Sequence, residues 1–136
     1  MPLALTLTSH DQTALKDRLT ELVGAANVLA TPEELDFYSS DIFDQRVLAE
    51  LVVRPGTPEE TAAAVALCTA ADRPVIPRGG GLSYTGGYLP VRERSVIFDL
   101  ARLDRIVEIN AEDMYVTVEA GVTWHQLYEA LRPPTD

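Results

Sequence analysis

The sequence predicts an α+β domain with a mixed sheet, in which a βαβ unit is followed by a meander of three strands. An apolar run at 51–53 ends in a Pro-Gly turn, and a helical pattern and a second apolar run follow it. Three further strand-like runs then come in succession before a last helix. A helix between two strands favours parallel pairing, whereas strands joined by short turns favour antiparallel pairing.

The helix starts share one capping pattern, in which a hydroxyl residue is followed three positions later by Glu or Gln. The hydroxyl accepts a hydrogen bond from the amide three residues on, and the later side chain returns to the cap amide. The four capping residues are Ser9, Thr31, Thr57 and Thr123. The predicted helices span 10–23, 32–39, 58–71 and 124–131.

The predicted strands are short apolar or alternating runs bounded by turn residues. They span 51–53, 74–77, 95–100, 105–109 and 114–119. Residues 1–45 are expected to form a helical extension ahead of the domain, which occupies 46–136. The chain leaves its last predicted helix through two prolines with no strand to close the sheet. We therefore expect the first portion of a larger domain, incomplete at its C-terminus.

Composition excludes several classes of function. The formal charge of −10 argues against a nucleic-acid surface and against binding to an anionic membrane face. No run approaches the roughly 20 apolar residues of a membrane span, so none is predicted. The single cysteine, Cys68, permits no internal disulfide and is expected in the core, which favours a reducing, cytoplasmic location. His10 and His125 lie far apart without a Cys cluster, so no metal site is predicted.

A glycine-rich segment, PRGGGLSYTGG at 77–87, holds five of the eight glycines. Glycine permits close approach of a ligand to the backbone, and successive amides can form a concave nest for phosphate oxygens. Arg78 offers positive charge, and Ser83 and Thr85 offer hydroxyl donors. Neither a dinucleotide fingerprint nor a Walker A loop fits, because Tyr84 stands where the fingerprint needs glycine and Gly87-Tyr88 where Walker A needs Lys and Ser or Thr. A surface loop without function is the alternative.

Four segments in order carry a family resemblance. They are VVRPGTPEETAAAVALC (52–68), PVIPRGGGLSYTGGYLP (74–90), VIFDLARLDRIVEI (96–109) and VTVEAGVTWHQL (116–127). Together they resemble the FAD-binding PCMH-type domain of the vanillyl-alcohol oxidase/p-cresol methylhydroxylase superfamily, especially FAD-linked oxidases of the glycolate oxidase and D-lactate dehydrogenase type. The resemblance implies an FAD-binding PCMH-type fold and an FAD-dependent oxidoreductase that oxidises a small-molecule substrate, a 2-hydroxy acid, by hydride transfer to the flavin.

The same resemblance implies the cofactor-binding residues. The loop expected to bind the FAD pyrophosphate comprises Pro77, Arg78, Gly79, Gly80, Gly81, Leu82, Ser83, Thr85, Gly86 and Gly87. The turn Ala120, Gly121 and Val122 resembles a family segment near the cofactor, and Asp99 and Leu100 are weaker candidates. Members similar to the berberine bridge enzyme carry a flavin-linked histidine where Leu82 stands, so non-covalent FAD is expected. Catalytic residues, the second FAD-binding half and a substrate cap are expected outside this chain.

The sequence leaves alternatives for the roles of four aromatic residues and for the function of the chain. Trp124 and Tyr128 are expected to pack together over the sheet, with a flavin or substrate contact as the alternative. Tyr84 and Tyr88 flank Gly86 and Gly87 and are candidates to stack on the cofactor. The alternative functions are a non-catalytic flavin- or nucleotide-binding module completed by another chain, and an interaction domain that has lost its ligand.

Overall fold

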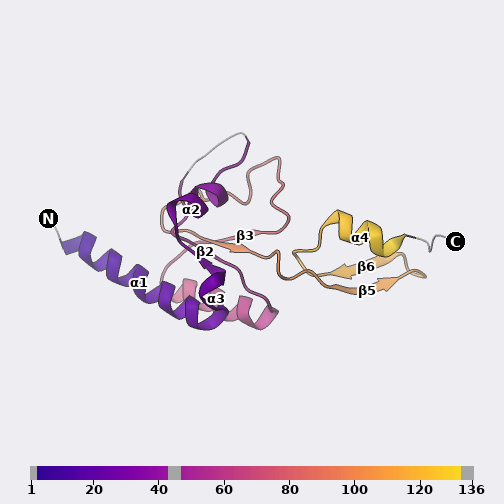
Figure 1. Cartoon of the computed structure of the whole chain (residues 1–136), viewed down its shortest axis with the longest axis horizontal. Coiled ribbons are helices and arrows are strands. Elements are labelled where there is room, and N and C mark those ends of the chain that lie inside the picture. The colour runs from indigo at the N-terminus through magenta and orange to yellow at the C-terminus, as the bar shows by residue number, and fades with distance from the viewer. Residues whose placement is uncertain (1–2, 43–46, 133–136) are drawn as a thin grey trace.

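The computed structural model describes residues 3–42 and 47–132, and its centre is a four-stranded mixed sheet (Figure 1). In spatial order its strands are β1 (Val28–Leu29), β2 (Leu51–Val53), β4 (Val96–Asp99) and β3 (Val75–Arg78). The strand β1 is antiparallel to β2, whereas β4 is parallel to both β2 and β3. The predicted mixed sheet is therefore confirmed.

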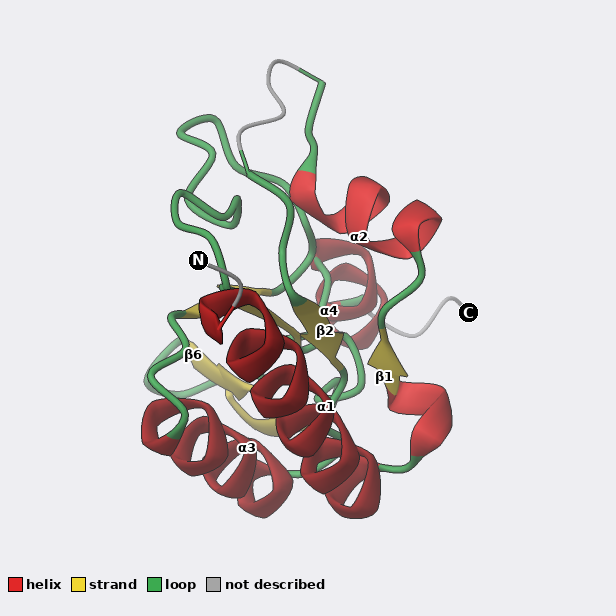
Figure 2. Cartoon of the chain, turned by 90° about the vertical axis from the view of Figure 1, so that its left-hand side faces the viewer, coloured by secondary structure: helices red, strands yellow, loops and turns green. Residues whose placement is uncertain are grey.

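Helices cover both faces of this sheet. The helices α1 (Leu3–Val23) and α3 (Pro58–Ala70) lie side by side on one face, and α2 (Pro32–Ser39) lies on the other (Figure 2). Leu51 and Val53 enter the core beneath α1 and α3, while Val52 between them enters the core beneath α2. Side chains alternate along a strand, so a continuous apolar run serves both cores.

The order of the strands differs from the predicted meander. The strand β4 does not pair with its successors but lies between β2 and β3, with Val52 opposite Ile97 and Pro77 opposite Phe98. Only β5 (Ile106–Asn110) and β6 (Tyr115–Val118) form an antiparallel pair, as a separate two-stranded sheet. The physical reason is burial. The strand β4 begins with three apolar residues and all four of its residues are buried, which suits a central parallel strand covered on both faces.

Three of the four helix starts are as predicted. Thr31 and Thr123 form complete capping boxes. Thr57 accepts from the Glu60 amide, while the Glu60 carboxylate accepts from the Gly56 amide instead of the cap amide. The prediction at Ser9 is wrong, because α1 begins at Leu3 and Ser9 lies inside it. No glycine or proline stands between them to stop the helix from extending.

The N-terminal segment contributes more than helices. The strand β1 joins the sheet beside β2, with Val28 opposite Val53. Two residues are too few to show a periodic pattern, so the sequence did not reveal this strand. Cys68 is fully buried in the core as predicted, and burial raises the pKa of its thiol to about 11.

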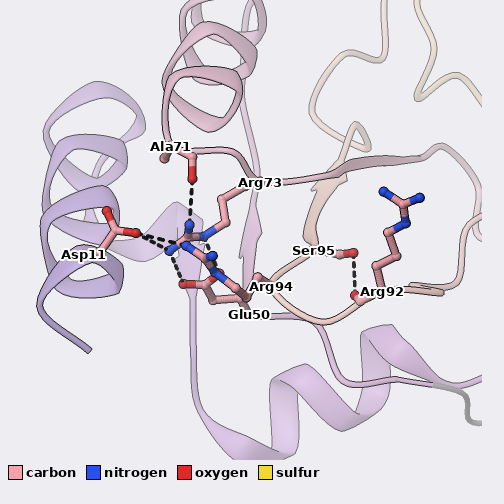
Figure 3. A network of polar contacts seen from close by, with 7 residues as sticks. All are labelled: Asp11, Glu50, Ala71, Arg73, Arg92, Arg94 and Ser95. Atoms are coloured by element: carbon pink, nitrogen blue, oxygen red, sulfur yellow. Dashed lines mark hydrogen bonds and ion pairs between the residues drawn. The ribbon is translucent and has the colours of Figure 1, made fainter. Parts of the chain in front are cut away.

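A buried arginine ties α1 to the main sheet (Figure 3). The Arg73 side chain has no exposed surface, and its Nε lies 2.6 Å from a Glu50 carboxylate oxygen. Its Nη2 also lies 3.0 Å from Asp11 on α1, and Arg94 reaches the same Asp11 oxygen at 3.0 Å. Burial disfavours the charge of Arg73, but the hydrogen bonds to Glu50 and Asp11 outweigh it, so the pKa of the guanidinium is raised.

The expected packing of Trp124 and Tyr128 over the sheet is wrong. Both lie on α4 (Trp124–Leu131) beside the β5–β6 hairpin, and they are 86% and 62% exposed. Two short strands offer too little surface to cover the apolar stripe of a helix. In the described part of the chain, no helix is long and apolar enough to cross a membrane.

Candidate functional site

The glycine-rich loop begins where β3 ends, at the carboxyl edge of the parallel strands. Arg78 is the last residue of β3, and its carbonyl accepts a hydrogen bond of 2.9 Å from the Leu100 amide just beyond β4. The loop returns through Leu89 and Pro90, which are both buried. Ligands of open α/β sheets bind outside the carboxyl ends of the strands, and this loop starts at that edge.

The two hydroxyl residues of the loop are engaged with each other. The Ser83 Oγ accepts from the Thr85 amide at 3.3 Å and from the Gly87 amide at 3.4 Å. The same oxygen lies 3.2 Å from the Thr85 hydroxyl oxygen. Farther along, the Leu89 amide donates to the Gly86 carbonyl at 3.0 Å. These bonds shape the second half of the loop from within, so Ser83 and Thr85 act first on the loop itself.

The first half of the loop presents bare backbone. A Cβ at Gly80 would meet no heavy atom within 4 Å, and Gly81 has a φ of +72° that strongly favours glycine. Within residues 3–42 and 47–132, the amides of residues 80–84 find no hydrogen-bond partner in the protein. Unpaired amides on an open backbone fit the phosphate oxygens of a cofactor such as FAD.

A second predicted segment lies directly behind the loop. A Cβ at Gly79 would come within 2.9 Å of the Ala120 carbonyl oxygen, so the loop and the turn at 120–122 touch. Gly121 is buried, and its amide donates to the Leu103 carbonyl at 2.8 Å. The structure thus brings together two segments that are 41 positions apart in the sequence.

Replacing Gly121 by alanine is expected to lower the free energy of unfolding by about 1–3 kcal/mol, the usual cost of overpacking. A Cβ there would collide with the Leu100 and Leu103 carbonyls and with the Ala101 Cα, which are all backbone atoms. Urea denaturation measures the difference. Gly80→Ala is the matched control, because its new methyl group meets no protein atom. Equal stability of the two variants would contradict the predicted collision.

Arg78 lies among aromatic rings. Its Cζ atom is 4.7 Å from the ring centre of Tyr88, 5.1 Å from that of Tyr38 and 5.7 Å from that of Phe37. Tyr88 therefore already stacks on Arg78, whereas Tyr84 is 91% exposed. A cavity of about 520 Å³ opens beside this cluster, between the loop and the end of α2. Its lining residues include Phe37, Ser40, Ile42, Leu82, Tyr84 and Tyr88.

Sequence reasoning did not find the residues that fix this end of α2. The Tyr38 hydroxyl donates a 2.6 Å hydrogen bond to Asp99 at the end of β4. Burial first, and then that hydrogen bond, raise the pKa of Tyr38 to about 12. Asp99 also accepts from the Ala101 amide and lies 3.4 Å from the Arg54 Nε. Asp99, a weaker cofactor candidate, is thus nearly buried and bonded to protein groups.

An α+β fold with an open glycine loop at the carboxyl edge of its parallel strands is typical of a domain that binds a phosphate-containing cofactor. Residues 49–134 match the family model described as FAD binding domain, and the chain belongs to this family. The family resemblance and the FAD-binding PCMH-type fold predicted from the sequence are thereby confirmed, and so is FAD as the cofactor.

Individual relatives agree with the family. The chain is 33% identical over 112 residues to mitochondrial D-lactate dehydrogenase (cytochrome) of Kluyveromyces lactis, covering 77% of this chain and 19% of that protein. It is 33% identical over 124 residues to the glycolate oxidase subunit GlcD of Escherichia coli, covering 90% and 25%. This chain therefore spans a quarter or less of the length of these two relatives.

Solved structures show the same architecture. A structure of p-cresol methylhydroxylase with substrate bound has a TM-score of 0.80 and 26% identity, covering 90% of this chain and 24% of that one. A structure of alkyldihydroxyacetonephosphate synthase has a TM-score of 0.75, covering 88% of this chain and 26% of that one, and at 19% identity it supports the fold alone.

Proposed function

We propose that this chain is the FAD-binding portion of an FAD-linked oxidoreductase that oxidises a 2-hydroxy acid. The observation that carries the proposal is the run of unpaired amides at 80–84, in a chain similar to a D-lactate dehydrogenase and a glycolate oxidase subunit. Bound FAD supplies the hydride acceptor. The residues of this chain bind and orient the cofactor, and the catalytic residues belong to parts outside it.

In this proposal the loop from Pro77 to Gly87 holds the pyrophosphate through its backbone. The amides of residues 80–84 have no hydrogen-bond partner among the described residues, and Gly80 leaves room for the phosphates to approach. The turn Ala120–Val122 supports the loop from behind at Gly79. Backbone amides bind an anion without a charged side chain, which explains how a chain with a net charge of −10 can hold a pyrophosphate.

FAD is proposed to be non-covalent, because Leu82, which is 84% exposed within the loop, has no nucleophilic atom that could bond to the flavin. We expect the product of the complete gene to be yellow and to release all of its FAD on denaturation. The measurement is visible absorption before, and of the filtrate after, denaturation in guanidinium. Flavin retained by the denatured polypeptide would contradict the non-covalent link, and a colourless protein that takes up no added FAD would overturn the proposed function.

The proposed enzyme includes a second FAD-binding half and a substrate cap. Two observations support further segments: the chain spans a quarter or less of the two relatives named above, and α4 with the hairpin exposes Trp124, Tyr128 and Met114. Large exposed apolar side chains on a short helix and hairpin are typical of a surface that another segment covers. A yellow protein without turnover of glycolate or D-lactate would favour the non-catalytic flavin-binding module instead.

Two assignments remain predictions. The segment 1–45 is proposed as an extension that precedes the domain at 46–136, and it contributes β1 and α2 to the structure. A cytoplasmic location is proposed from the single cysteine, and cell fractionation tests it.

A further inference from the structure

The surroundings of Arg78 suggest a role other than direct contact with phosphate. Its guanidinium is enclosed by three rings, Phe37 and Tyr38 from α2 and Tyr88 from the loop, which we call the arginine cage. Its Nη1 also donates to the Tyr38 carbonyl at 3.4 Å. Among residues 3–42 and 47–132, no carboxylate forms an ion pair with Arg78. Among the described residues, the guanidinium therefore contacts the three ring faces and the Tyr38 carbonyl.

The guanidinium packs directly against the turn of the loop. A Cβ at Gly81 would lie 2.8 Å from the Arg78 Nη2 and 3.0 Å from its Nε. Gly81 has a φ of +72°, so the backbone turns there, within the run of unpaired amides at 80–84. Arg78 therefore fills the space beside this turn, and moving its side chain would remove the support that the turn rests on.

The cage is itself anchored to the main sheet. Tyr38 donates a 2.6 Å hydrogen bond to Asp99 at the end of β4. The next residue, Ser39, is buried, and its Oγ accepts from the Ala49 amide at 2.9 Å. The helix α2 precedes residues 49–134, which match the FAD-binding family model. A segment outside the matched region thus supports the candidate cofactor loop.

We propose that Arg78 is a positioning residue that holds the loop in its open-amide conformation, and that α2 takes part in cofactor binding through Phe37 and Tyr38. The inference rests on the proposed function, because it assigns these residues to the FAD site. A positioning role for Arg78 makes a different demand on the side chain than a direct contact between its charge and the phosphate. The flat faces of the guanidinium are needed, and a charge alone is not sufficient.

Substitutions separate the two roles. Arg78→Lys keeps the charge and loses the flat stacking group, whereas Tyr38→Leu keeps the arginine and removes a wall of the cage. We expect each to weaken FAD binding about tenfold, as the loss of a cation–π contact would. Both changes break the same contact, between the Arg78 guanidinium and the Tyr38 ring. The double variant is therefore expected to bind FAD only slightly less tightly than the single variant with the lower affinity. Tyr38→Phe restores the ring and is expected to recover most of the affinity lost in Tyr38→Leu.

The measurements use the product of the complete gene. FAD affinity is determined by titrating the apoprotein. Hydrogen exchange is followed in the apoprotein at the Thr85, Gly87 and Leu89 amides, which are hydrogen-bonded within the loop. Faster exchange of these amides in Arg78→Lys and Tyr38→Leu is expected, since the loop loses its support. Arg18→Gln, which changes an exposed arginine of α1, is the control and should alter neither quantity.

The outcomes distinguish this inference from the proposed function. A wild-type protein that binds FAD, with Arg78→Lys binding equally well and Arg78→Gln binding poorly, would show a direct charge contact and overturn the positioning role. Unchanged exchange in both cage variants would also overturn it. A wild-type protein that takes up no FAD would overturn the proposed function and, with it, the cofactor role of α2.

Discussion

Replacing Gly80 by leucine is expected to lower the FAD affinity about 100-fold, equivalent to about 2.7 kcal/mol of binding free energy. A Cβ at Gly80 meets no protein atom within 4 Å, and the residue is exposed, so the new side chain fits the folded protein. The same side chain would occupy open space next to the unpaired amides, where the pyrophosphate is proposed to lie. Its effect therefore falls on the ligand and spares the fold.

Gly80 is a cleaner test than its neighbour Gly81, although sequence reasoning treated the two alike. A side chain at Gly81 would press on Arg78 and would need an unfavourable positive φ. The affinity is measured by titrating apoprotein with FAD, and stability by urea denaturation. Ala111→Leu, in the exposed turn of the hairpin, is the control and should change neither value. Wild-type FAD content in Gly80→Leu would remove the loop from the proposed site.

Replacing Arg73 by methionine is expected to lower the free energy of unfolding by about 3 kcal/mol, as for other buried ion pairs that lose one partner. The Glu50 side chain is 8% exposed, and its two oxygens accept from Arg73 at 2.6 and 3.1 Å. Methionine fills much of the space but leaves this carboxylate buried without its partner. Asp11 is less affected, because it is 48% exposed and keeps Arg94 (Figure 3).

Two further variants separate the loss of the ion pair from the loss of packing. Adding Glu50→Gln to Arg73→Met removes the buried charge, so we expect the double variant to regain part of the stability. Arg94→Met removes the exposed arginine that shares Asp11 and is expected to cost less than about 1 kcal/mol. Urea denaturation provides all three values. Equal losses of unfolding free energy in Arg73→Met and Arg94→Met would show that burial of the Arg73–Glu50 pair does not add to its contribution to stability.

Features that depend on neighbouring residues were predictable from the sequence. Thr31 and Thr123 start helices because each cap and its partner lie within one turn, and such bonds form wherever the segment folds. The strand at 51–53 and the helix at 124–131 have the bounds that the patterns predicted. The glycine loop was also recognisable, because its open backbone follows from the absence of side chains at Gly79, Gly80 and Gly81.

Tertiary structure decided the features that depend on residues far apart in the chain. Local patterns identified β4 as a strand, but its central place follows from covering both of its apolar faces. The charge of Arg78 suggested a phosphate contact, and only the packing of α2 reveals the rings around it. Trp124 and Tyr128 have the spacing of a buried stripe and yet lie exposed. Sequence periodicity specifies which side chains share a face, whereas burial of that face requires a surface that other segments supply.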